Sequence, residues 1–92
     1  MNKSMENIKK KIESAVHIYK SGDLVKAESA TNKLIEEHPK SPFLYNLLGL
    51  ILSGQGKNDQ AIISYEKSIN VDPNFAMSYN NLGLLYVNHK VI

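Results

Sequence analysis

The sequence repeats itself with a period of 34 residues, and this period limits the fold more than any other feature. Sliding the chain along itself by 34 positions superposes identical residues throughout its length. The pairs are Gly22 and Gly56, Ala27 and Ala61, Ile35 and Ile69, Pro39 and Pro73, Tyr45 and Tyr79, Leu48 and Leu82, and Gly49 and Gly83. A fixed period of roughly 20 to 50 residues is typical of stacked supersecondary units, each of which buries its apolar face against its neighbour.

Apolar spacing and helix-ending residues predict two helices in each full period. Gly22 and Gly56 stand where a left-handed residue ends a first helix, and Pro39 and Pro73 end the second helices. Ser41 before Pro42 is a favourable N-cap and first-turn pair, and Asp23 and Asn74 are further candidate caps. The pattern predicts helices over residues 5–20, 24–37, 42–54, 58–71 and 75–89. Their short connections favour antiparallel neighbours.

Small residues recur inside the predicted helices, at a cost in helix propensity of about 1 kcal/mol for glycine relative to alanine. Gly49 and Gly83, with Ala15 in the first period, stand in the first helices, and Ala27 and Ala61 stand in the second helices. We expect these positions to let paired helices approach closely, with large side chains such as Tyr65 filling the space around the contact.

Residues 42–75 resemble the signature of the tetratricopeptide repeat family, and residues 8–92 follow it as a whole. The matching pattern is Tyr45-x2-Leu48-Gly49-x2-Leu52, then Ala61-x3-Tyr65, then Pro73. Tyr79-x2-Leu82-Gly83-x2-Tyr86 repeats its first half. The resemblance implies an all-α fold, a right-handed α-solenoid of antiparallel helix pairs with five helices: two full units and the first helix of a third.

The period divides the chain into four segments. Residues 1–7 are a lead-in, 8–41 form a degenerate first unit, 42–75 form the second unit, and 76–92 form the first helix of a truncated third unit. The first unit departs most from the family, because Lys11, Ser14, Ala15 and Ile18 stand at its first-helix positions. Because the third unit lacks a second helix, we expect the chain to be a piece of a longer repeat protein.

The composition argues against most kinds of chemistry. The chain has no cysteine, and its histidines, His17, His38 and His89, lack a neighbouring ligand at metal-binding spacing. We therefore expect no enzyme activity, no metal and no cofactor. A net charge of +2 from scattered lysines does not indicate a nucleic-acid site, and no apolar run is long enough for a signal peptide or a membrane span. A cytoplasmic location is predicted.

The resemblance implies a binding site for a protein or peptide on the concave surface, which the first helix of each unit lines in this family. The candidate groove residues are Ile12, Val16, Phe43, Asn46, Leu47, Leu50, Met77, Asn80, Asn81 and Leu84. The predicted helix over 42–54 is apolar almost all round, so its side chains either pack between neighbouring helices or form an apolar groove.

Two subclasses of the family can be compared with these positions. The charged clamp that grips chaperone C-termini is not matched, because Ile12, Val16, Leu47, Met77 and Asn81 replace its lysines, asparagines and arginine. Asn81 does resemble the asparagines of O-linked N-acetylglucosamine transferases, which hold peptide backbones by two amide hydrogen bonds. Leu47 and Glu13 occupy the corresponding places in the other units, so only one unit matches.

The predicted last helix would leave an apolar side uncovered. Leu82, Leu85 and Tyr86 are therefore candidates for self-association with a second copy. The leading interpretation is a non-enzymatic module that binds a peptide segment. Two alternatives remain at this point: a recognition arm at the N-terminus of a larger enzyme, such as a glycosyltransferase or sulfotransferase, and a purely structural assembly unit.

Overall fold

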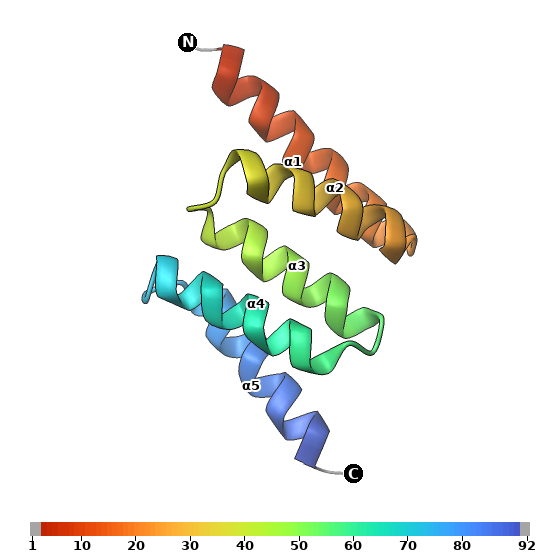
Figure 1. The fold of residues 1–92 in the computed structure, drawn as a ribbon, viewed down its shortest axis with the longest axis vertical. Coiled ribbons are helices and arrows are strands. Elements are labelled where there is room, and N and C mark those ends of the chain that lie inside the picture. Colours follow the sequence, from red (N-terminus) through yellow and green to blue (C-terminus); the bar gives the residue numbers. More distant parts are fainter. Residues whose placement is uncertain (1–2, 91–92) are drawn as a thin grey trace.

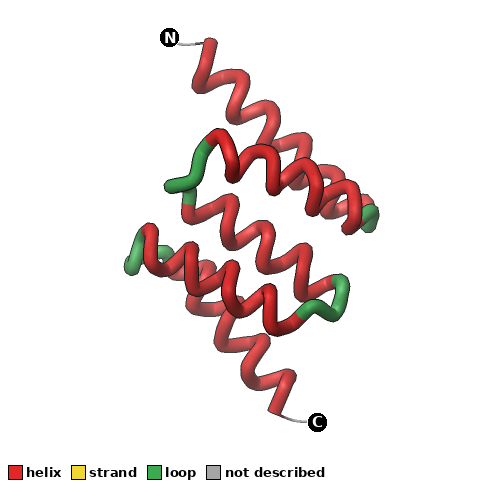
Figure 2. The backbone as a smooth tube through the Cα atoms, in the orientation of Figure 1, coloured by secondary structure: helices red, strands yellow, loops and turns green. Residues whose placement is uncertain are grey.

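The computed structural model describes residues 3–90 and consists of five α-helices joined by short loops (Figures 1 and 2). The helices are α1 (Lys3–Ser21), α2 (Leu24–Glu37), α3 (Pro42–Gly54), α4 (Asn58–Val71) and α5 (Ala76–Lys90). The predicted ranges of α2, α3 and α4 are confirmed at both ends. Helix α1 begins at Lys3, two residues earlier than predicted, so the segment before the first repeat unit continues directly into this helix. Residues 1–2 and 91–92 lie outside the described part.

Consecutive helices run antiparallel, and the two chain ends lie at opposite ends of an elongated molecule measuring 48 × 29 × 17 Å (Figure 1). Helices α1 and α5 pass behind α2 and α4 in this view. Helix α3 is the central element, because it contacts all four other helices. The fold is an all-α helical repeat. Among the described helices, none combines the length and the hydropathy that crossing a membrane requires.

Local signals explain most helix ends. Ser41 Oγ accepts a hydrogen bond from Leu44 N at 3.3 Å, and Asp23 Oδ1 accepts one from Lys26 N at 3.1 Å, so both caps are confirmed. Gly22 and Gly56 adopt φ values of 95° and 79°, the left-handed region that glycine enters without strain. The prediction for Asn74 is wrong. Its backbone N donates to Asp72 Oδ1 at 3.0 Å in a turn, and α5 begins later, at Ala76.

Two apolar clusters form the core, one on each side of α3. The first joins α1, α2 and α3 through buried residues that include Ala15, Ala27 and Leu34. The second joins α3, α4 and α5 and consists of Leu52, Ala61, Tyr65 and Leu85, with Leu48, Ile62 and Leu82 packed against it. Because α3 is covered from both sides, its nearly continuous apolar surface is explained by packing.

The predicted close approach within a helix pair is confirmed in the second unit. The aromatic ring of Tyr65 lies directly against Gly49, where a Cβ atom would stand 2.6 Å from Tyr65 Cδ1 and 2.8 Å from Tyr65 Cζ. The first unit has different residues at the equivalent positions, Ala15 and Thr31, and both are buried. A smaller partner on one helix thus accompanies a larger residue on the other.

Candidate protein-binding face

Most of the predicted groove residues lie on the first helix of each unit with part of their surface open to solvent. Ile12 and Val16 on α1 and Phe43 and Leu50 on α3 are half-buried. On α5, Met77 is 48% and Leu84 60% exposed, Asn80 is exposed and Asn81 is half-buried. We call these eight residues the α1–α3–α5 face: Ile12, Val16, Phe43, Leu50, Met77, Asn80, Asn81 and Leu84.

The prediction was wrong for two of the groove residues on α3. Asn46 is 1% and Leu47 3% exposed, so neither side chain can contact a partner directly. Leu47 belongs to the first core cluster with Leu34 and Leu44, and Asn46 is bonded to α5. The cause is packing between helices, because α5 covers Asn46 while Leu47 packs with residues of α1 and α2.

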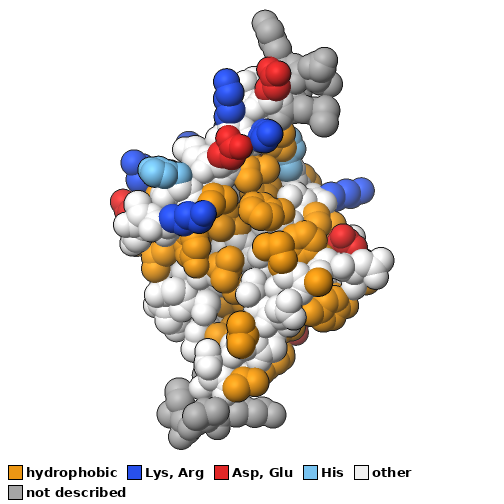
Figure 3. All heavy atoms as spheres, turned by 180° about the vertical axis from the view of Figure 1, so that it is seen from behind, with side chains coloured by type: hydrophobic (Ala, Val, Ile, Leu, Met, Phe, Trp, Pro, Cys, Tyr) orange, Lys and Arg blue, Asp and Glu red, His pale blue; other side chains and the backbone are white. Residues whose placement is uncertain are grey.

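Figure 3 shows the side of the molecule that lies behind α2 and α4 in Figure 1, where α1 and α5 face the viewer. Apolar side chains gather in the middle of this side, and several charged side chains lie around them toward the N-terminal end. An apolar area surrounded by polar residues is typical of a surface that binds another protein.

A chain of buried polar groups joins α5 to α3 and α4 beneath this face. Ser68 Oγ donates to Pro42 O at 2.8 Å, and Ser78 Oγ lies 2.6 Å from Ser68 Oγ. Asn46 Oδ1 lies 3.0 Å from Ser78 Oγ and 2.9 Å from Asn81 Nδ2. Ser68 and Ser78 are fully buried. Buried polar groups need such partners, because an unpaired one costs about 1–3 kcal/mol.

The same four positions are apolar in the preceding interface. One period earlier, each residue of the network has an apolar counterpart that lies in or against the first core cluster. The pairs are Ile12 with Asn46, Leu34 with Ser68, Leu44 with Ser78, and Leu47 with Asn81. The sequence prediction missed Ser68 and Ser78 altogether, although this joint change from apolar to polar residues at a 34-residue offset is a signal that could have revealed them.

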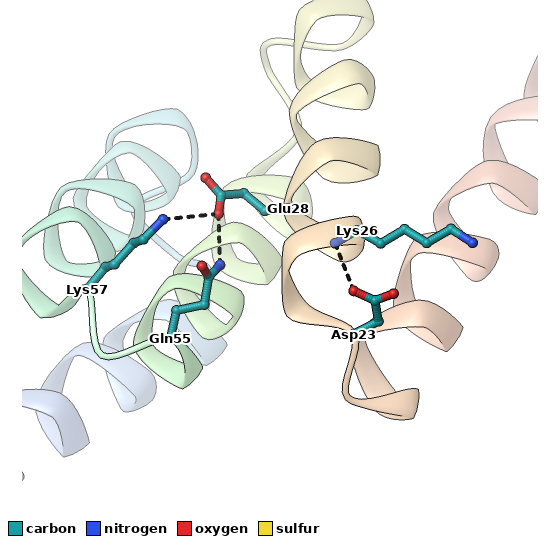
Figure 4. A network of polar contacts seen from close by, with 5 residues as sticks. All are labelled: Asp23, Lys26, Glu28, Gln55 and Lys57. Atoms are coloured by element: carbon teal, nitrogen blue, oxygen red, sulfur yellow. Dashed lines mark hydrogen bonds and ion pairs between the residues drawn. The ribbon is translucent and has the colours of Figure 1, made fainter.

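A second polar cluster lies at the turn between α3 and α4 and connects it to α2 (Figure 4). Gln55 Nε2 donates to Glu28 Oε1 at 2.7 Å, and Lys57 Nζ lies 3.5 Å from the same oxygen. Figure 4 also shows the Asp23 cap contacting Lys26 on the neighbouring turn. Glu28 is one-quarter exposed and Lys57 more so, so the ion pair adds little stability, but the contacts fix the first unit against the second.

Of two hollows of the surface, one lies beside the α1–α3–α5 face and the other overlaps its α5 part. One hollow of about 350 Å³ lies between α1 and α2, with Lys11, Lys33 and Glu37 among the residues that line it. A wider, shallow hollow of about 560 Å³ lies on α5. It is lined by Tyr79, Asn80, Gly83, Leu84 and Val87. Asn80 and Leu84 therefore belong both to this hollow and to the face.

The residues predicted for self-association divide into exposed and buried ones. Leu85 is only 7% exposed because it belongs to the second core cluster, so the prediction was wrong for Leu85. Leu82 is half-buried and packs against the same cluster. Tyr86 is 43% exposed, as expected. Tyr79 and Val87 are exposed as well and, with Tyr86, form the open side of α5.

The described residues offer few groups for chemistry. Burial raises the pKa of Tyr65 to about 12, with a smaller contribution from Tyr19, so its phenol stays neutral at physiological pH. Within residues 3–90, no three histidine or acidic side chains cluster in a way that could hold a metal ion.

Comparisons with known proteins agree with the repeat pattern. A family model described as "TPR repeat" matches residues 49–90, and one described as "Tetratricopeptide repeat" matches residues 30–63. The anaphase-promoting complex subunit CDC27 of Saccharomyces cerevisiae is 38% identical over 61 residues, which are 66% of this chain and 8% of that protein. None of these matches bears on the predicted similarity to O-linked N-acetylglucosamine transferases. Because the two models together span residues 30–90, the chain belongs to the tetratricopeptide repeat family.

Proposed function

We propose that the chain is a non-enzymatic protein-interaction module that holds a peptide segment of a partner protein against the α1–α3–α5 face. The observation that carries the proposal is the set of partly exposed apolar side chains on α1, α3 and α5, above a buried network that joins α5 to α3 and α4. Apolar side chains that a folded protein leaves exposed together often serve binding. The similar yeast protein is named as a subunit of a complex, which agrees with a role in protein–protein contacts.

Replacing Met77 with aspartate tests this proposal. Met77 is 48% exposed on the face, so the change should leave folding intact, while a charge in an apolar contact should weaken peptide binding about tenfold or more. The measurement is the affinity for a peptide selected from a random phage-displayed library on the intact chain.

The matched control is Ile63→Asp. Ile63 is 51% exposed on α4, outside the face, so this variant introduces the same charge at a similarly exposed apolar residue and should bind the peptide as the unchanged chain does. Equal losses in both variants would contradict the assignment of the binding site to the α1–α3–α5 face.

We also propose that a further helical surface covers the open side of α5 when the protein works. A Cβ atom at Gly83 would meet nothing within 4 Å, whereas its counterpart Gly49 is covered by Tyr65. In a longer repeat array, the next helix would cover Gly83 as α4 covers Gly49. For this chain by itself, we propose that a second copy of the chain covers the open side of α5.

Sedimentation at increasing concentration tests the pairing of copies. Exposed apolar residues on one helix supply only part of the roughly 800 Å² per partner that stable dimers bury, so we expect a weak dimer. Val87→Glu should shift the chain toward monomer, because Val87 is 58% exposed on the open side of α5. Val25→Glu, at a residue 74% exposed on α2, should leave the association unchanged. A monomer at every concentration would contradict self-association.

A further inference from the structure

Helices α3 and α5 carry the same signals for docking on the helix pair that precedes each of them. Identical residues stand at three equivalent positions: Tyr45 and Tyr79, Leu48 and Leu82, and Gly49 and Gly83. We call the surface of α1 and α2 that receives α3 the first slot, and the surface of α3 and α4 that receives α5 the second slot. The loops that lead into the two slots, residues 38–41 and 72–75, have equal length. Neither the signature nor the loops therefore decide which helix enters which slot.

A chain with two similar slots has an alternative arrangement, in which two copies exchange helices with a shift of one period. Helix α3 of one copy enters the second slot of the other copy. Helix α5 of that other copy then enters the first slot, which α3 has left. Every slot still holds one helix, so this register-shifted dimer has as many docked helices as two separate chains. At high concentration, the number of docked helices alone does not exclude such an exchange.

The second slot matches α5 through hydrogen bonds. Ser68 Oγ lies 2.6 Å from Ser78 Oγ, and Asn46 Oδ1 lies 3.0 Å from Ser78 Oγ and 2.9 Å from Asn81 Nδ2. Asn46, Ser68 and Ser78 are at most 1% exposed, so water does not reach them. If α3 entered this slot, leucines would replace Ser78 and Asn81, and the buried amide of Asn46 would lose both of these partners. An unpaired buried amide opposes that docking.

The first slot excludes α5 for the converse reason. Ile12 and Leu34 lie at the positions of this slot that correspond to Asn46 and Ser68, and both belong to or pack against the first core cluster. Their side chains have no hydrogen-bonding group, so a serine hydroxyl and an asparagine amide brought by α5 would be buried there without partners. The register-shifted dimer contains both mismatches, whereas the monomer contains neither.

We propose that the buried polar network fixes the register of the helices: it admits α5 to the second slot and keeps α3 out of it, so that each chain folds on itself. The second slot is thereby selective for a helix that presents a hydroxyl and an amide three positions apart, as Ser78 and Asn81 do on α5. Buried polar groups that select one pairing of helices at a cost in stability are known from coiled coils. This role does not depend on peptide binding at the α1–α3–α5 face.

Refolding of a variant whose two slots are alike tests the proposal. The fourfold variant carries the residues found one period earlier: Asn46→Ile, Ser68→Leu, Ser78→Leu and Asn81→Leu. Every protein in the test also carries Val87→Glu, which weakens association through the open side of α5. The proteins are refolded from urea at high concentration and diluted, and the remaining dimer is measured by sedimentation. Exchanged dimers separate only by unfolding, so the fourfold variant should retain roughly tenfold more dimer than the chain with its network.

The matched control makes the slots different again without changing the amino-acid composition of the natural network and its counterparts. It adds Ile12→Asn, Leu34→Ser, Leu44→Ser and Leu47→Asn to the fourfold variant, so that the polar groups move to the first slot. This eightfold variant should refold to monomer. If circular dichroism shows that it does not fold, the fourfold variant and the chain with its network still decide the question.

A thiol crosslinker identifies the register of the dimer, because the chain has no cysteine of its own. The side chains of Asn46 and Asn81 are 2.9 Å apart, and Ile12 is the counterpart of Asn46 one period earlier. In a register-shifted dimer, position 81 of one copy therefore meets position 12 of the other. Ile12→Cys and Asn81→Cys, placed in the otherwise fourfold variant, should crosslink two chains.

Three results would overturn the proposal. The first is a fourfold variant that refolds to monomer as completely as the chain with its network. The second is a dimer of the fourfold variant whose chains are not joined by the crosslinker. The third is a folded eightfold variant that forms as much persistent dimer as the fourfold variant, since different slots would then fail to prevent the exchange.

Discussion

Replacing Gly49 with alanine is expected to destabilise the chain by about 2 kcal/mol, whereas the same change at Gly83 is expected to stabilise it by about 1 kcal/mol. The two glycines occupy equivalent positions of the repeat, so sequence alone predicts equal effects. Their surroundings differ. A Cβ atom at Gly49 would meet the ring of Tyr65 at 2.6–2.8 Å, and a Cβ atom at Gly83 would meet nothing within 4 Å.

The ring of Tyr65 cannot easily move aside. It is 2% exposed and packs among Leu52, Ala61 and Leu85. Overpacking of this kind costs about 1–3 kcal/mol, which outweighs the gain of about 1 kcal/mol from replacing glycine by alanine within a helix. At Gly83 there is no overpacking, so only the stabilisation from the higher helix propensity of alanine remains. For a chain of this size, whose total stability is roughly 5–14 kcal/mol, both changes are readily measured by urea unfolding.

A double-mutant cycle assigns the effect to the contact between the two residues. Tyr65→Thr together with Gly49→Ala reproduces the pair that the first unit uses, Ala15 with Thr31. The single change Tyr65→Thr should cost about 3–5 kcal/mol through the cavity it leaves. The double variant should be more stable than the sum of the two single effects by about 2 kcal/mol. Equal effects of alanine at Gly49 and Gly83, or simple additivity in the cycle, would contradict the close approach.

Most of the fold could be predicted from the sequence because its signals are local. Left-handed glycines, prolines after the second helices and the Ser41 cap each act on their own turn of the chain. Three of the five helices have the predicted ends for this reason. The cap at Asn74 failed because Asp72, two residues earlier, bonds the backbone N of Asn74 and closes a turn before α5 can begin.

The candidate site was predicted less well because it depends on contacts between helices. Because α3 is apolar on nearly all sides, its sequence does not show which side faces the core. The sequence therefore could not predict that Leu47 is buried while Leu50 stays partly exposed. On α5, the burial of Leu85 could not be predicted from the sequence for the same reason. Ser68 and Ser78 have the composition of surface residues, and only the packing of α5 against α3 and α4 brings them together in the interior.

The largest gain in stability is expected from making the second interface a copy of the first. The variant combines Asn46→Ile, Ser68→Leu, Ser78→Leu and Asn81→Leu, which are the residues found one period earlier. Replacing a buried ion pair with well-packed apolar side chains is often neutral or stabilising by about 1–4 kcal/mol, and we expect the same direction for this uncharged network, because each newly buried leucine adds to the apolar area removed from water. We expect the free energy of unfolding to rise by about 3 kcal/mol.

The single change Asn46→Ile should act in the opposite direction. It removes the group that contacts both Ser78 and Asn81, so the inward amide atom of Asn81 loses its partner and Ser78 keeps only its contact with Ser68. An unsatisfied buried polar group costs about 1–3 kcal/mol, so this variant should be less stable than the unchanged chain. If the single substitution lowers the free energy of unfolding and the four substitutions together raise it, the four polar groups act as a unit.

Thermal and urea unfolding of the two variants at low concentration test this prediction, with the fraction of persistent dimer as a second measurement. The two slots of the fourfold variant are alike, so it should be more stable and yet form more persistent dimer. The polar network would then be retained for the pairing of helices at the expense of stability. A fourfold variant that is less stable than the unchanged chain would show that α5 does not pack on the second unit in the way that α3 packs on the first.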